Sequence, residues 1–140
     1  MKVAMFVAAM VITGLTGSTP AGADGAIAVG STSNVARDGI ALGTAINYKT
    51  PDEARDAAVK RCHAFKPAPK AAALCQLVGT FKGECYAIAF DPKAGTPGAG
   101  WAIAATKELA EQRALANCKA TAGPARQDFC VIDESKCDGT

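Results

Sequence analysis

The chain has 140 residues, a formal net charge of +2 and six cysteines. A charge so close to zero offers no basic face to nucleic acid, and we expect no nucleic-acid partner. No segment beyond residue 23 approaches the about 20 apolar residues that a membrane-spanning helix needs. Residues 24–140 are too few for two ordinary domains and enough for one, so we expect a single domain there.

Residues 1–23 have the parts of a secretory signal peptide. Lys2 gives a positive start, residues 3–15 form a short apolar run, and small residues at 21–23 follow Pro20. The pattern predicts cleavage before Asp24 and a secreted or periplasmic protein. The alternative is that residues 1–23 form a buried N-terminal helix.

The first strand candidate of the remaining chain is the Ala-Ile-Ala motif at 26–28, which recurs at 87–89. A second strand candidate begins at Gly43 and again at Gly100, where Gly-x-Ala-Ile recurs. Short apolar runs bounded by turn-forming residues are typical of strands. The segment between the two strands is rich in turn-forming residues in both copies, which predicts a loop in each.

A helix is predicted after each strand pair, at 50–62 and at 106–118. Thr50 and Thr106 can cap these helices, and Pro51 is well tolerated at a first helical position. Both segments carry alanine at the fifth and ninth positions and cysteine at the last, which places small residues along one stripe. Such a stripe lets a helix lie close against a sheet, with the cysteine facing inward.

A third strand that opens with a cysteine follows each helix, from Cys75 and from Cys130. The order strand, strand, helix, strand therefore occurs twice, in repeat one at about 25–80 and in repeat two at about 85–137. This order predicts an α+β fold, in which the two repeats form a mainly antiparallel sheet with two helices packed on it.

All six cysteines lie beyond the predicted leader, and an even number in a small exported chain is typical of a disulfide framework. Zinc is the alternative, but it needs closer pairs than Cys130 and Cys137, the nearest two. We therefore expect disulfides, with no metal or other cofactor. Sequence alone leaves many pairings open. The repeat symmetry favours Cys62 with Cys75 and Cys118 with Cys130, and the two cysteines that remain, Cys85 and Cys137, would then form the third bridge.

These motifs resemble an exported bacterial family, the domain of unknown function 4189. The resemblance covers residues 25–137 and is carried by the paired Ala-Ile-Ala strands, by GWAIAATKELAEQRALANC at 100–118 and by Cys-Val-Ile at 130–132. It implies a secreted or periplasmic α+β domain with disulfides. It implies no established activity, and it supplies no catalytic residues to transfer to this chain.

The residues themselves show no clear catalytic constellation. The only histidine, His63, follows Cys62, which a disulfide would remove as a nucleophile. A histidine at a helix end, near the negative end of the dipole, is the simpler interpretation. Carboxylates that could act as the acid and base of a hydrolase are Asp52, Glu53 and Asp56 at the first helix start, and Asp133 with Glu134 near the C-terminus.

We expect a non-catalytic binding or interaction module that meets another envelope or extracellular protein, for instance as an inhibitor. The candidate contact surfaces are the open face of the sheet and the loops at 31–39 and 91–99, because loops on a rigid scaffold commonly carry recognition. Trp101 is expected in the core. The rival hypotheses are a hydrolase that uses the helix-start carboxylates and a purely structural envelope component.

Overall fold

A computed structural model describes residues 23–140, so the predicted leader lies outside the described residues apart from Ala23. The elements follow in the order β1 (Asp24–Ser31), α1 (Val35–Asp38), β2 (Ile40–Tyr48), α2 (Pro51–His63), α3 (Pro69–Ala72), β3 (Gln76–Lys82), β4 (Cys85–Phe90), β5 (Ala99–Ala104), α4 (Lys107–Ala122), η1 (Gln127–Phe129) and β6 (Val131–Cys137). The short helices α1, α3 and η1 lie in the connections. The strand-strand-helix-strand order therefore occurs twice, as predicted.

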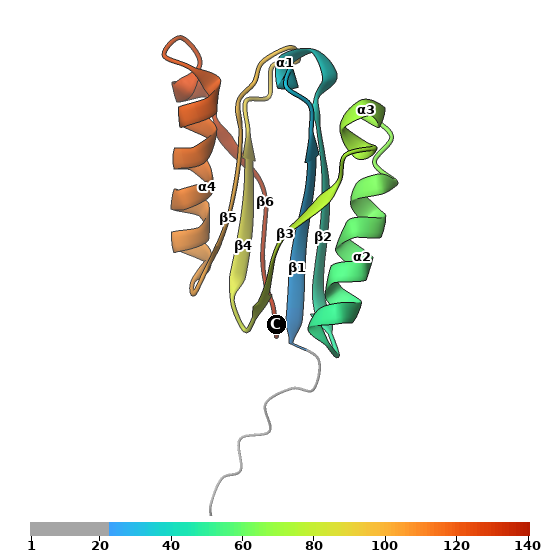
Figure 1. The fold of residues 1–140 in the computed structure, drawn as a ribbon. Helices are drawn as coiled ribbons and strands as arrows, with labels where there is room; N and C mark the ends of the chain where they lie inside the picture. Colours follow the sequence, from blue (N-terminus) through green and yellow to red (C-terminus); the bar gives the residue numbers. More distant parts are fainter. Residues whose placement is uncertain (1–22) are drawn as a thin grey trace, which may run out of the picture.

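The strands form two antiparallel sheets of three strands each, with the orders β2-β1-β3 and β5-β4-β6. The α+β class is confirmed, and each repeat makes a sheet of its own. In Figure 1 the two sheets lie between α2 and α4, which form the outer layers. The prediction of an open sheet face is wrong, because one face of each sheet packs on a helix and the other on the opposite sheet.

Alternation along the first strand of each repeat explains the Ala-Ile-Ala motif. Ala26 and Ala28 pack against α2, whereas Ile27 and Val29 belong to the cluster between the sheets. Strand β4 alternates in the same way, with alanines toward α4 and larger side chains toward the other sheet: Ala87 and Ala89, then Tyr86 and Ile88. Successive side chains of a strand point to opposite faces, so one motif builds both layers of the core.

The helices approach the sheets closely enough to require glycine. A Cβ atom at Gly43 would lie 2.0 Å from the carbonyl oxygen of Ala58, and one at Gly100 would lie 2.2 Å from that of Ala114. Real Cβ atoms do not come so near another atom. The predicted small-residue stripes therefore let backbone pack against backbone in both repeats.

Threonine caps begin both long helices, as predicted. The hydroxyl of Thr50 accepts a hydrogen bond from the Glu53 amide at 3.2 Å, and that of Thr106 accepts one from the Leu109 amide at 3.2 Å. Each cap satisfies a backbone N–H that the first helical turn leaves without a partner.

Three disulfides brace the fold, and they are the expected pairs: Cys62–Cys75, Cys118–Cys130 and Cys85–Cys137. The first two tie the C-terminal part of a long helix to the strand that follows it. The third joins the start of β4 to the end of β6, where the two residues pair across the sheet.

The sheet register gives a residue-by-residue correspondence between the repeats. Ile27 of β1 lies between Thr44 of β2 and Gly79 of β3. Its counterpart in β4 is Ile88, which lies between one residue of β5 and one of β6, namely Trp101 and Glu134. Both registers then shift by one residue directly after the isoleucine. Thr44 and Trp101 are therefore equivalent positions, as are Gly79 and Glu134.

Candidate functional site

The two hairpin loops at 31–39 and 91–99, called the loop end below, meet at one end of the molecule (Figure 1). A cavity of about 240 Å³ lies between them. Val35 and Ile40 line it from the first repeat, and Phe90, Lys93 and Thr96 line it from the second. The segments predicted as contact surfaces from separate parts of the sequence thus form one surface.

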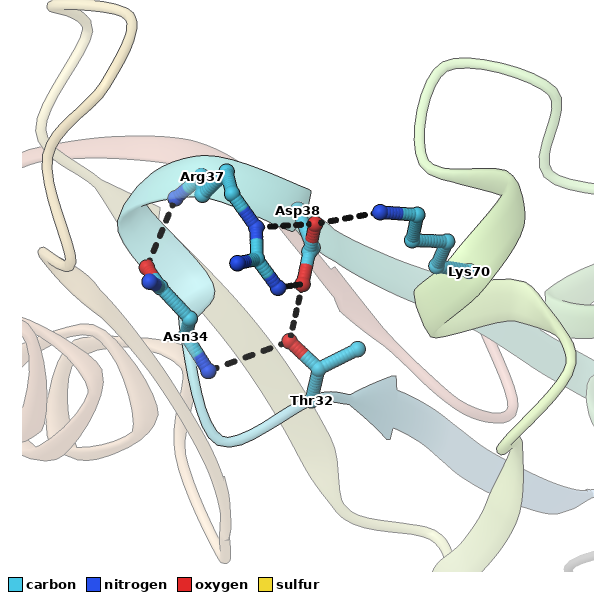
Figure 2. Close-up of polar contacts among 5 residues, drawn as sticks. All are labelled: Thr32, Asn34, Arg37, Asp38 and Lys70. Atoms are coloured by element: carbon cyan, nitrogen blue, oxygen red, sulfur yellow. Dashed lines mark hydrogen bonds and ion pairs between the residues drawn. The ribbon is translucent and has the colours of Figure 1, made fainter.

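A buried carboxylate anchors the first loop. The Asp38 side chain is only 4% exposed, and it accepts hydrogen bonds from the Thr32 hydroxyl at 2.9 Å and from Arg37 at 2.7 and 2.9 Å (Figure 2). Lys70 of α3 lies 3.3 Å away, and the Asn34 side chain accepts from the Arg37 amide at the start of α1. The hydrogen bonds from Arg37 hold the pKa of Asp38 well below its usual range.

A second buried carboxylate anchors the other loop. The Asp91 side chain is fully buried and accepts two hydrogen bonds from Arg126, at 2.6 and 2.7 Å, and one from the Lys93 amide at 3.0 Å. The paired guanidinium holds the pKa of Asp91 well below its usual range. Arg126 also lies over the Phe129 ring at 4.0 Å.

Both anchors follow the same design, since a loop carboxylate binds a cation from the connection between helix and third strand. That cation is Lys70 in repeat one and Arg126 in repeat two. Each loop is therefore held in place by an ion pair with a distant segment of the folded chain.

A second cavity, called the edge groove below, opens where β2 meets β6 and has a volume of about 160 Å³. Its lining consists of Leu42, Thr44, Phe65, Ile88, Phe90, Asp133 and Glu134. Phe90 also lines the cavity at the loop end, so the two hollows are neighbours on one surface.

A polar network crosses from one sheet to the other beside this groove. The buried Tyr86 hydroxyl donates a hydrogen bond to Glu134 Oε1 at 2.7 Å and lies 3.2 Å from Thr44 Oγ1. Lys136 Nζ lies 2.5 Å from the same Oε1. Burial raises the pKa of Tyr86. Burial also opposes ionisation of Glu134, but the hydrogen bonds from Lys136 and Tyr86 outweigh it and lower the Glu134 pKa. At neutral pH the network is therefore a neutral phenol that donates to a carboxylate.

The network is not predictable from the sequence, because its members are far apart along the chain. Tyr86 lies 42 residues from Thr44 and 48 from Glu134. In the sequence, Glu134 is a candidate only as an acid or base, and a further signal is a difference between the repeats. Glu134 stands where the register of repeat one has Gly79, a charge in place of a residue without a side chain.

The helix-start carboxylates predicted for a hydrolase lie at the end of the molecule opposite the loop end (Figure 1). Asp52, Glu53 and Asp56 are all exposed, and Arg55 pairs with Asp52 at 3.1 Å and with Asp56 at 3.2 Å. The structure does not bring them together with His63, which lies at the other end of α2.

Two further predicted positions have local structural roles. His63 Nδ1–H donates to the Ala72 carbonyl at 2.7 Å and so joins α2 to the end of α3. Trp101 packs against the cluster between the sheets, with part of its surface exposed. Among residues 23–140, no group of three His, Cys, Asp or Glu side chains is arranged to hold a metal ion.

The described chain is thus an α+β sandwich of two repeats, braced by disulfides and hollowed at one end and along one edge. Residues 25–137 match the family model for the domain of unknown function DUF4189, and the chain belongs to this family. Neither the curated proteins nor the solved structures gave a significant match. None of the helices between residues 23 and 140 is long and apolar enough to cross a membrane. Three disulfides fit an oxidising, non-cytoplasmic compartment.

Proposed function

We propose that this chain is a non-catalytic binding module, secreted or periplasmic, that recognises another protein through its loop end. The observation that carries the proposal is the meeting of two loops from different repeats, each anchored by a buried carboxylate, around a shared cavity. Recognition by loops on a rigid scaffold is common among binding proteins, and inhibition of the bound protein is one consequence of it.

The size and lining of the cavity support a protein partner. At about 240 Å³ it lies below the ~300–1,000 Å³ of sites for drug-sized ligands. Its walls combine apolar side chains with Lys93 and Thr96, a mixture that suits protruding side chains of another protein.

Capture experiments with a matched pair of variants test the proposal. The exported, oxidised chain is immobilised and exposed to envelope and medium extracts. Ala36→Glu with Ala94→Glu places two carboxylates in the loop-end cavity, whereas Ala105→Glu with Ala116→Glu adds the same charge at exposed positions on and beside α4. We expect the parent and the α4 variant to capture one stoichiometric protein, and the loop variant to lose it.

Three results would contradict the proposal, and the first two point to a rival. If this chain is abundant and captures no stoichiometric partner, a purely structural role is favoured. Hydrolytic activity that falls on Asp52→Asn or Glu53→Gln, while the fold survives, favours the hydrolase hypothesis. Equal capture by the parent and both variants would place recognition away from the loop end.

A further inference from the structure

The two edges at which the sheets meet have equivalent positions and different contents. At one edge β3 faces β5, since a Cβ atom at Gly79 would lie 3.3 Å from Ile103 Cδ1. At the other edge β2 faces β6, since Tyr86 bridges Thr44 and Glu134 there. The register shows that the two edges are equivalent, so the residues at one edge can be compared with those at the same positions of the other.

The contents of the two edges decide whether space is left between the sheets. One edge combines Trp101 with Gly79: the Trp101 ring packs against the cluster between the sheets, and Ile103 of the same strand approaches Gly79. The other edge combines Thr44 with Glu134, a small polar residue with a carboxylate, and there the edge groove opens. The groove is therefore a property of these residues and not a requirement of the fold.

The lining of the edge groove combines apolar side chains with negatively charged ones. Leu42, Phe65, Ile88 and Phe90 supply the apolar part, and the charged side chains of the lining, Asp133 and Glu134, are both acidic. Tyr86 and Lys136 both contact Oε1 of Glu134, and Oε2 accepts no hydrogen bond within residues 23–140. Asp133 is exposed and makes no ion pair within the described range.

The cations nearest this groove are already engaged, with the lining residues Thr44 and Glu134 or with Tyr48. Arg61 of α2 donates to the Thr44 carbonyl and, at 3.1 Å, to the Tyr48 hydroxyl. Lys136 is 56% exposed and pairs with Glu134 Oε1. An added strand along β2 would have to displace Arg61 from the Thr44 carbonyl, which disfavours recognition by strand addition.

We propose that the edge groove receives a lysine or arginine side chain of the protein partner. The aliphatic stem of that side chain packs on the apolar lining of the groove, and its cationic head pairs with Glu134 Oε2 and Asp133. A hollow of about 160 Å³ fits one side chain and not a drug-sized molecule. The inference rests on the proposed function, because Phe90 joins the groove to the loop end where that partner is held.

An NMR titration of the exported, oxidised chain tests the groove by itself. The probes are acetyl-Gly-X-Gly-amide peptides in which X is lysine, arginine, norleucine or glutamate, added to about 10 mM. We expect the lysine and arginine peptides to shift the amide signals of Thr44, Ile88 and Glu134. Norleucine keeps the stem without the charge and is expected to bind about tenfold more weakly, and the glutamate peptide not at all.

Variants of the chain test whether the contacts with Glu134 and the open edge cause the peptide to bind. Glu134→Gln is expected to weaken the lysine peptide about tenfold, while Glu108→Gln, an exposed carboxylate of α4, leaves it unchanged. Thr44→Trp copies the Trp101 edge and is expected to abolish binding. Since Thr44→Trp has to repack an edge, its fold is checked by the dispersion of its amide signals. If Thr44→Trp does not fold, Glu134→Gln alone decides whether the groove binds the lysine peptide.

The outcomes separate this inference from the proposed function. Equal shifts with lysine and norleucine, shifts that survive Glu134→Gln, or capture of the partner that Glu134→Gln leaves unchanged would overturn the groove proposal and leave the loop end as the binding surface. Failure of the parent chain to capture any partner would overturn the proposed function itself. Binding of the lysine peptide, together with weaker partner capture by Glu134→Gln than by Glu108→Gln, supports the groove.

Discussion

The contact between α2 and its sheet and the contact between α4 and its sheet use the same residue types at the same places. Gly43 lies under α2, and Gly100 lies under α4. A Cβ atom added at either glycine would lie less than 2.5 Å from the helix backbone. The two sheet edges, in contrast, share no side chain at their equivalent positions, where Thr44 and Glu134 stand against Trp101 and Gly79.

This contrast shows where the fold constrains the chain and where it does not. A helix backbone packed this closely leaves room only for glycine at the strand position beneath it, because even a methyl group would collide with a carbonyl group. An edge between two sheets can be filled by one large ring or left open, because solvent can occupy the space. We therefore look for functional differences at the edges and at the loops, and for stability in the shared helix contacts.

The largest expected effect comes from a brace that only repeat two possesses. Cys85 and Cys137 pair across β4 and β6, at the place where repeat one has Asp24 opposite Lys82. Their sequence separation is 52 residues, against 13 and 12 for the other bridges. Replacing both by alanine is expected to cost about 4 kcal/mol of unfolding free energy, and about 3 kcal/mol for either of the other pairs.

Urea unfolding of the three double variants measures this order. If loss of the Cys85–Cys137 bridge cost less than loss of Cys62–Cys75 or Cys118–Cys130, the loop-length argument would fail for this fold.

The shared helix contacts are tested by a single added methyl group. Gly43→Ala and Gly100→Ala are each expected to cost about 3 kcal/mol, because the new Cβ would collide with the helix backbone, which cannot move aside freely. Gly79→Ala is the control, since its new Cβ would meet only the tip of Ile103, and we expect less than about 1 kcal/mol. Urea midpoints of the three variants provide the measurement. A large difference between Gly43→Ala and Gly100→Ala would break the equivalence of the two contacts.

The loop anchors are expected to differ in strength although their design is shared. Asp91→Asn should destabilise the chain more than Asp38→Asn, because Asp91 is fully buried and its partner Arg126 is 25% exposed, whereas Arg37 beside Asp38 is 65% exposed. The exposed Asp56→Asn is the control. Thermal unfolding at neutral pH ranks the three variants, and a larger effect at Asp38 would contradict the role assigned to burial.

The same anchors predict an acid sensitivity with a definite sign. The pKa of Asp38 and that of Asp91 are lowered in the folded state. Below about pH 4 these two carboxylates therefore bind protons in the unfolded chain but stay ionised in the folded chain. The stabilisation is therefore complete above about pH 4 and is lost as the pH falls further. Urea unfolding at neutral pH and at about pH 3 should show a smaller loss in Asp91→Asn than in the parent. An equal loss would mean that other groups cause the acid sensitivity.

The smallest expected effects are at the helix caps, where the repeats should behave alike. Thr50→Ala and Thr106→Ala each remove one hydrogen bond to a backbone amide and are expected to cost about 1 kcal/mol. Serine at either position keeps the hydroxyl and should restore most of the loss. Retention of full stability by either alanine variant would show that its cap adds nothing in the folded chain.

The sequence predicted the loops at 31–39 and 91–99 but neither their meeting nor the polar network, because both depend on distant segments coming together. Strand β4 follows β3 directly, yet the two belong to different sheets, and only this placement puts Tyr86 beside Thr44. The anchors Asp38 and Asp91 look like ordinary loop carboxylates in the sequence. Their cations lie in connections 32 and 35 residues further on.

The sequence by itself determined what local chemistry determines: the strand-strand-helix-strand order, the threonine caps, and the small-residue stripe that leads to Cys62 in one repeat and Cys118 in the other. These features depend on turns, caps and side-chain spacing within a few residues of each other. Only the tertiary structure decided that the strands divide into two sheets, that the large faces of β1 and β4 cover one another, and that one edge stays open. Those outcomes depend on which apolar faces meet, and each of the two sheets buries its Ile-rich face only against the other.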